Sequence, residues 1–127
     1  DLDVVLDVWE EEPNLNPQLA QKVLLATPHI AGYSLEGKIR GTYELYRQLR
    51  LWLGKEAVIA LESKLPQTQL WQKPKHLADL HDTLKPFYDI KEDDLALKAI
   101  ASKENPLLAQ QFDLLRKNYK TRLEYWR

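Results

Sequence analysis

Two short apolar stretches decide the fold: residues 3–9 read Asp-Val-Val-Leu-Asp-Val-Trp, and residues 23–29 read Val-Leu-Leu-Ala-Thr-Pro-His. The first is rich in β-branched and apolar side chains, so it predicts a short strand buried on both faces, as in parallel sheets. The second predicts another short strand that ends at Thr27-Pro28, because proline cannot donate a hydrogen bond to a sheet. Between them, the prolines and asparagines of residues 13–17 indicate a loop or a single helical turn.

A long helix is predicted to follow the second strand. Ser34 is a good N-cap, and Gly54 stands where a glycine commonly ends a helix. Apolar side chains recur between them at helical spacing, at Leu35, Ile39, Tyr46, Leu49 and Leu53. Gly37 and Gly41 lie inside this helix, which predicts close packing against a neighbouring backbone.

The pattern changes after Gly54, where a strand at residues 57–61 and a polar connection at 62–73 are predicted. Helices are expected at 75–84, then through residues 95–100 after capping by Asp93 and Asp94, and finally from an N-cap at Asn105. The last helix carries an apolar stripe of Leu108, Phe112, Leu115, Tyr119 and Trp126.

Composition excludes several classes of protein. The 127 residues include 18 basic and 19 acidic side chains, and the net charge of −1 argues against nucleic-acid binding that depends on bulk charge. No apolar run reaches the roughly 20 residues needed to cross a membrane. The chain has no cysteine, which excludes disulfides and thiolate metal sites. His76 and His81 lack the spacing of a helical zinc pair, so no metal site is expected.

The residues that can carry chemistry follow the two strands. His29 comes just after the second strand, and three glutamates, residues 10–12, follow the first. Loops at strand ends of α/β sheets commonly bind ligands, and a histidine paired with a carboxylate can transfer protons. Taken alone, these residues are a weak signal, because a lone histidine in a loop is more often a surface or structural group and three successive glutamates are more often a solvated loop.

A resemblance to a known family favours the catalytic interpretation. D-isomer-specific 2-hydroxyacid dehydrogenases carry a strand ending in Asp-Val-aromatic, an acidic residue before proline, and Thr-Pro-His. This sequence has Asp7-Val8-Trp9, Glu12-Pro13 and Thr27-Pro28-His29 at these places. The runs at residues 27–38 and 115–119 resemble one branch of the family, whose members have an extra C-terminal dimerisation domain.

The resemblance implies a role for five residues. His29 would be the general acid/base that exchanges a proton with the substrate 2-hydroxyl, and Glu12 would pair with it and orient it. Asp7 would contact the nicotinamide end of the cofactor NAD, and Gly32 would line the same cofactor. Tyr33 would touch the small-molecule substrate, a phosphorylated 2-hydroxy acid. From the residues alone, Asp7 could instead cap a strand, Gly32 could form a turn with positive φ, and Tyr33 could simply pack.

The resemblance also implies an α/β fold in three parts. Residues 1–33 would form the C-terminal edge of a Rossmann-type NAD-binding domain, residues 34–54 a connecting helix, and residues 55–127 a small α+β dimerisation domain. The sequence has no Gly-x-Gly-x-x-Gly run and no counterpart of the family's catalytic arginine. We therefore expect a C-terminal fragment, inactive alone, of a cytoplasmic, homodimeric enzyme. The alternative is a homodimerisation module of a related dehydrogenase with another substrate.

Overall fold

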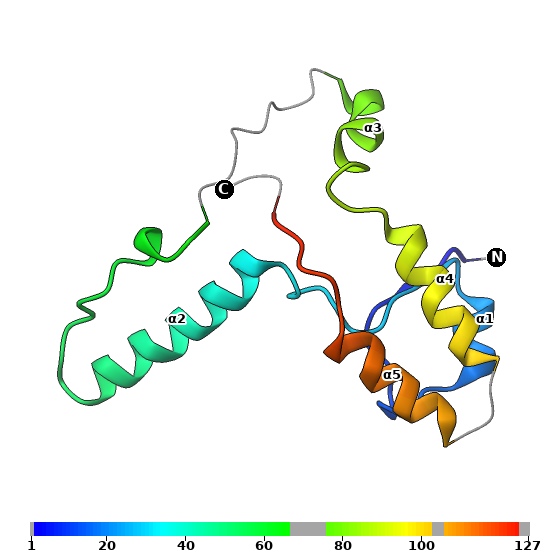
Figure 1. Ribbon diagram of the computed structural model, residues 1–127, viewed down its shortest axis with the longest axis horizontal. Coiled ribbons are helices and arrows are strands. Elements are labelled where there is room, and N and C mark those ends of the chain that lie inside the picture. The colour runs from blue at the N-terminus through cyan, green and yellow to red at the C-terminus, as the bar shows by residue number, and fades with distance from the viewer. Residues whose placement is uncertain (1, 67–75, 103–105, 125–127) are drawn as a thin grey trace. The chain divides into compact units, whose positions relative to one another are not determined.

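A computed structural model describes residues 2–66, 76–102 and 106–124 (Figure 1). The chain divides into two compact units that are not continuous in sequence. Unit 1 comprises residues 1–31 and 88–120, and unit 2 comprises residues 32–87 and 121–127. Within unit 1, residues 88–120 pack with the N-terminal strands.

The sheet of unit 1 consists of two short strands, β1 (Val5–Leu6) and β2 (Leu25–Ala26). They pair in parallel, with Val5 opposite Leu25 and Leu6 opposite Ala26, as the apolar stretches predicted. The first strand is shorter than residues 3–9, and the prediction that both its faces are buried is wrong. Val5 of β1 is 54% exposed, so the side of the strand that it faces is open in the described chain.

Residues 13–16 form the expected loop, and helix α1 (Pro17–Lys22), which was not predicted, follows it before β2. Asn16 caps it by accepting hydrogen bonds from the amides of Gln18 and Leu19. Pro17 occupies the first turn, where its missing N–H is no loss. The short helix therefore begins where its sequence provides both a cap and a preset backbone angle.

Two further helices complete unit 1: α4 (Ile90–Ala101) and α5 (Leu107–Lys117). The expected capping by Asp93 and Asp94 is wrong. Asp89 is the N-cap, and the two acids lie inside α4 with their side chains buried. Pro106 is the residue that precedes α5, whereas Asn105 and Trp126 lie outside the described residues.

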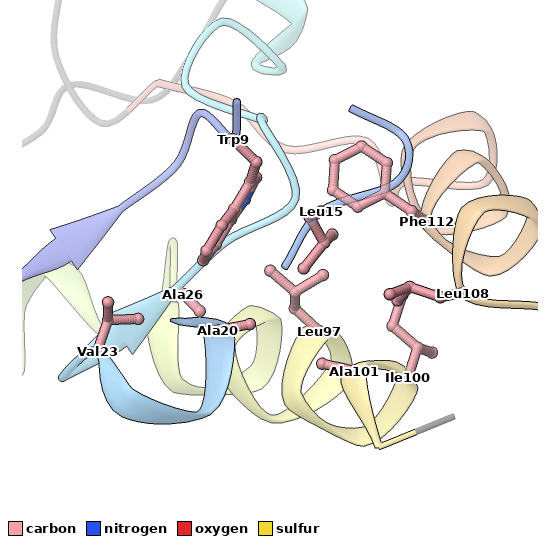
Figure 2. Packing of buried hydrophobic residues seen from close by; sticks show 10 residues of the cluster. All are labelled: Trp9, Leu15, Ala20, Val23, Ala26, Leu97, Ile100, Ala101, Leu108 and Phe112. Carbon is pink, nitrogen blue, oxygen red and sulfur yellow. The ribbon is translucent and has the colours of Figure 1, made fainter. Parts of the chain in front are cut away.

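A hydrophobic core joins these helices to the strands (Figure 2). Trp9 lies against α1 and β2, Leu97 of α4 occupies the middle, and Leu108 and Phe112 close the α5 side. Helix α4 therefore packs against both α1 and β2, which makes it the scaffold of the unit.

Unit 2 contains the predicted long helix, α2 (Leu35–Trp52). Ser34 caps its start by accepting a hydrogen bond from the amide of Gly37, and Gly54 follows its end with a φ of 66°. The apolar stripe is only half-buried at its start, and its far end is exposed, with Leu49 54% and Leu53 49% accessible. The close packing predicted for two glycines is present at Gly37 and missing at Gly41, where an added Cβ would meet no atom within 4 Å.

The C-terminal segment of unit 2 runs beside the start of α2. The amide of Leu35 donates to the carbonyl of Arg122, and Ser34 forms a parallel bridge with the same residue. The buried carboxylate of Glu36 accepts a hydrogen bond from the amide of Glu124 at 2.9 Å. These contacts fasten residues 121–124 to the first turn of the helix.

Residues 57–61 do not form the predicted strand. Residues 57–60 are exposed, and a 3₁₀ turn, η1 (Leu61–Ser63), begins at the last residue of the predicted strand. A second turn, η2 (Leu77–Asp79), leads into α3 (Leu80–Leu84), which matches most of the helix expected at 75–84. The fold is therefore mixed α/β, with a small two-stranded parallel sheet as the β component of the described residues. None of the helices in the described ranges is both long and apolar enough to span a membrane.

Candidate active site

The candidate site lies where the two parallel strands end. β1 ends at Leu6 and is followed by Asp7, and β2 ends at Ala26 and is followed by Thr27-Pro28-His29. Because the strands are parallel, these following residues meet at the same edge of the sheet, where α/β proteins commonly bind ligands. The structure thus brings Asp7 and His29 together from positions far apart in the sequence.

The carboxylate of Asp7 organises the turn that carries the histidine. Its Oδ1 accepts hydrogen bonds from the hydroxyl of Thr27 at 2.6 Å and from the amide of Ile30 at 2.8 Å. Its Oδ2 accepts a hydrogen bond from the amide of Ala31 at 3.0 Å. Two successive amides that converge on one anion form a backbone nest, so the charge of Asp7 fixes the shape of the turn.

These contacts lower the pKa of Asp7. Burial alone would raise it, but the hydrogen bonds from Thr27, Ile30 and Ala31, together with the charge of His29, outweigh that effect and hold the pKa below its ordinary value. Asp7 is therefore ionised over the whole physiological pH range.

His29 adopts a left-handed backbone conformation, with a φ of 54°. Few residues other than glycine do so, although histidine is among the better tolerated. The sequence had suggested a positive φ at Gly32, but in the described chain glycine takes this conformation only at Gly54. The left-handed backbone at His29 is what turns the two following amides toward Asp7.

Glu12 lies against the histidine. One of its oxygens, Oε2, is 2.8 Å from Nδ1 of His29, and the other, Oε1, accepts the amide of Trp9 at 2.8 Å. The glutamate side chain is 17% exposed and the imidazole 42% exposed. A carboxylate can only accept, so Nδ1 carries the proton and Nε2 is the free lone pair of the neutral imidazole. In the neutral imidazole, Nε2 is thus the basic nitrogen, and the ring is more exposed than the carboxylate that it contacts.

Trp9 and Thr27 belong to the quoted motifs and contribute to the site, although neither was assigned a role from the sequence. The indole N–H of Trp9 donates to the buried carbonyl of Thr27 at 2.9 Å. This bond ties the acidic loop to the end of β2, two residues before His29. A signal was present, since a buried tryptophan needs an acceptor for its N–H, but the sequence does not reveal which carbonyl it meets.

The two remaining candidate residues belong to unit 2. Gly32 is exposed, and a Cβ added there would meet no atom within 4 Å. Tyr33 is half-buried, with the ammonium of Lys38 above its ring at 4.4 Å from the centroid. Glu10 and Glu11 are exposed, as a solvated loop would be. In the part of the chain that the structure describes, no three His, Asp or Glu side chains group as a metal site would require.

Comparison with known proteins places the chain in a family. Residues 61–127, slightly more than half of the chain, match the family described as a domain of unknown function (DUF3410). The chain therefore belongs to the DUF3410 family. Its mixed α/β architecture, with a histidine–glutamate pair where parallel strands end, is consistent with part of a dehydrogenase domain.

Three similar relatives share one name. The chain is 43% identical, over 98% of its length, to "Erythronate-4-phosphate dehydrogenase" of Escherichia coli O127:H6 (strain E2348/69 / EPEC). It is 42% identical over the same share to proteins of that name from Escherichia coli O1:K1 / APEC and from Escherichia fergusonii. The chain spans 32% of the length of each of these relatives.

Proposed function

We propose that this chain is the C-terminal part of an NAD-dependent 2-hydroxyacid dehydrogenase. The substrate would be 4-phospho-D-erythronate and the product 2-oxo-3-hydroxy-4-phosphobutanoate, a step toward pyridoxal phosphate in the cytoplasm. The observation that carries the proposal is the contact between Nδ1 of His29 and Glu12, found in a chain whose relatives are named erythronate-4-phosphate dehydrogenase.

The chemistry of this pair suits the oxidation of a secondary alcohol. With Nδ1 committed to Glu12, Nε2 of His29 accepts the proton of the substrate hydroxyl as the carbonyl forms. The imidazolium that results is stabilised by the adjacent carboxylate, which the amide of Trp9 holds in place. In the reverse direction the same nitrogen returns the proton.

NAD, when bound, would accept the hydride from the substrate carbon. Asp7 suits the nicotinamide end, because Oδ2 accepts a hydrogen bond from the amide of Ala31 and retains the capacity for a carboxamide N–H. Gly32 suits a bound group for a different reason. No packing within the described chain requires a glycine there, and its surface is open to an approaching ligand.

Tyr33 would touch the substrate, as the resemblance implies. The names of the relatives support a phosphorylated substrate. Assaying 4-phosphoerythronate against unphosphorylated 2-hydroxy acids with the full-length protein tests the substrate class.

Replacing His29 with alanine in the full-length protein tests the catalytic role. We expect kcat to fall by about 10²–10⁴-fold, which is the usual contribution of general acid–base catalysis. His76→Ala is the matched control, since His76 is exposed and belongs to unit 2. Turnover close to wild type in His29→Ala would refute the assignment.

A second candidate function, homodimerisation, rests on the outer surface of α5. Leu107 is 52% exposed and Leu114 44% exposed, and their spacing of two helical turns places them on one side of the helix. Ile100, Gln111, Leu114, Leu115 and Asn118 line a shallow groove of about 310 Å³ beside them. We expect sedimentation velocity to show a dimer of the full-length protein and a shift toward monomer in Leu107→Glu/Leu114→Glu. A strict monomer at micromolar concentration would exclude this role.

A further inference from the structure

We propose that Asp94 of helix α4 is a positioning residue for His29. Asp94 holds strand β2 from the side opposite β1. Because Asp94 lies within residues 61–127, which match the DUF3410 family, that family's domain takes part in building the catalytic site. The catalytic half of this inference rests on the proposed dehydrogenase function. The geometric half concerns the strand itself and can be tested without any activity.

The free edge of β2 is where Asp94 acts. On the β1 side, the amides of Leu24 and Thr27 donate to the carbonyls of Val4 and Leu6. The amide of Ala26, between them, donates instead to Oδ1 of Asp94 at 2.8 Å in a buried contact. An edge strand normally leaves such amides unpaired or exposed to water, so a side chain of α4 occupies the place of a further strand.

Lys98 completes this arrangement one helical turn later. Its ammonium lies 2.9 Å from Oδ1 of Asp94 and donates to the carbonyls of Val23 at 3.1 Å and Leu24 at 3.3 Å. The ion pair therefore supplies β2 with both an acceptor and a donor. The side chain of Asp94 is only 12% exposed and that of Lys98 22% exposed. Such a buried pair is weak evidence for stability on its own, because desolvation opposes the attraction between the charges.

The stretch from Ala26 to His29 has little freedom to absorb a displacement. Three hydrogen bonds fix Thr27. Its amide donates to the carbonyl of Leu6, its hydroxyl donates to Asp7, and its carbonyl accepts from the indole of Trp9. Pro28 is buried, and its ring restricts the backbone. A shift of Ala26 is therefore passed on to His29 and changes its distance from a substrate held by other groups.

The neighbouring acid shows what a purely structural role looks like. Asp93 is equally buried, but it accepts the hydroxyl of Tyr119 at 2.8 Å and thus links α4 to the residues after α5. Its hydrogen bond is to Tyr119, whereas that of Asp94 is to the amide of Ala26 in β2. Asp93→Ala is therefore the matched control for Asp94→Ala: it removes a buried carboxylate of the same helix and leaves the strand edge intact.

The experiment uses the full-length protein with three variants: Asp94→Ala, Asp94→Asn and Asp93→Ala. For Asp94→Ala we expect kcat to fall by about 10²-fold, the cost of a displacement of about 1 Å, with both KM values nearly unchanged. Asp94→Asn should recover most of this loss, because its amide oxygen can still accept the Ala26 amide. Asp93→Ala should lower the melting temperature and leave the kcat of the folded enzyme unchanged.

Hydrogen exchange gives a readout that does not depend on catalysis. The amide of Ala26 should lose protection in Asp94→Ala and keep it in Asp93→Ala, relative to the amide of Thr27 in each protein. If Asp94→Ala does not fold, Lys98→Met provides the same test, since it retains the stem and removes the ammonium from the strand carbonyls. In that variant we expect faster exchange at Ala26 and a smaller fall in kcat.

The outcomes separate this inference from the proposed function. Unchanged kcat and unchanged Ala26 protection in Asp94→Ala overturn the positioning role, as does an equal loss of kcat in Asp93→Ala. If His29→Ala has no effect on turnover, the dehydrogenase assignment fails whatever Asp94 does. Loss of kcat in both His29→Ala and Asp94→Ala, with recovery in Asp94→Asn, supports both.

Discussion

The turn at residues 27–31 and the second half of helix α2 differ in how far their hydrogen bonds reach along the chain. Thr27, His29, Ile30 and Ala31 bond to partners 17–24 residues away. In α2, Glu44, by contrast, bonds to Arg47 and Gln48, within one helical turn. The hydrogen bonds of Glu44 close within the helix, whereas those of the turn require two distant segments to lie side by side. A site of fixed geometry requires several contacts that hold the same residues in place.

Among these variants, the largest loss of stability should come from replacing Asp7. Asp7→Ala leaves the hydroxyl of Thr27 and two successive amides without their acceptor, and we expect the free energy of unfolding to fall by about 2–3 kcal/mol. Asp3→Ala, at an exposed position before the same strand, is the control and should be close to neutral. Chemical denaturation of the two variants measures the difference, and equal stability would contradict the role of the nest.

Asp7 should also make this stability depend on pH. Its pKa is lowered in the folded protein, so its contribution is complete above the ordinary value of 3.8 and is lost as the pH falls through the lower folded value. Denaturation at pH 7 and near pH 3 should therefore show a smaller acid loss in Asp7→Asn than in wild type. An identical acid loss in both proteins would mean that other carboxylates dominate.

Trp9 tests the next strongest tie of the turn. Trp9→Phe retains an aromatic ring but leaves the buried carbonyl of Thr27 without a donor, so we expect destabilisation by about 1–2 kcal/mol. Trp52→Phe in α2 is the matched control. Trp52 is 81% exposed, and its replacement should change stability by less than about 0.5 kcal/mol. Thermal unfolding of both variants decides the point, and similar melting temperatures would count against the tie.

Gly37 and Gly41 test where α2 is closely packed. A Cβ at position 37 would lie 2.8 Å from Oγ of Ser34 and 2.9 Å from the carbonyl oxygen of Gly32. Gly37→Ala should therefore destabilise by about 1 kcal/mol, since overpacking outweighs the gain in helix propensity. Gly41→Ala meets no such atom and should stabilise by about 0.5–1 kcal/mol. Effects of the same sign in the two variants would show that packing does not distinguish position 37 from position 41.

The smallest effect is expected at Glu44. The hydrogen bonds from Arg47 and Gln48 lower the pKa of Glu44 to about 2, which NMR titration of the side chain can verify. Glu44 is fully exposed, so Glu44→Gln should leave the melting temperature unchanged within error. A clear loss of stability would mean that the pair with Arg47 contributes more than an exposed ion pair usually does.

The sequence predicted the features that depend on neighbouring residues. Ser34 and Gly54 bound α2 as expected, because caps and helix stops are local signals. The apolar stretches predicted the two paired strands for the same reason. The contact of Glu12 with His29 was implied by the resemblance, and their catalytic roles stay a prediction.

The features that depend on distant residues were not predictable in this way. Val58 and Ile59 have strand propensity, but such propensity is expressed only where a neighbouring strand is available, and residues 57–61 have none among the described residues. Asp94 looked like a helix cap, because nothing in the local sequence indicates that Ala26 needs an acceptor. The left-handed backbone of His29 likewise follows from the position of Asp7, not from the residues around it.

The left-handed conformation of His29 has a consequence for how this position can change. Its backbone favours glycine, whereas proton transfer requires an imidazole, so the two demands conflict at one residue. His29→Gly should therefore be more stable than His29→Ala and as inactive. Under the proposed catalytic role, selection for stability would favour glycine at this position and selection for proton transfer would favour histidine.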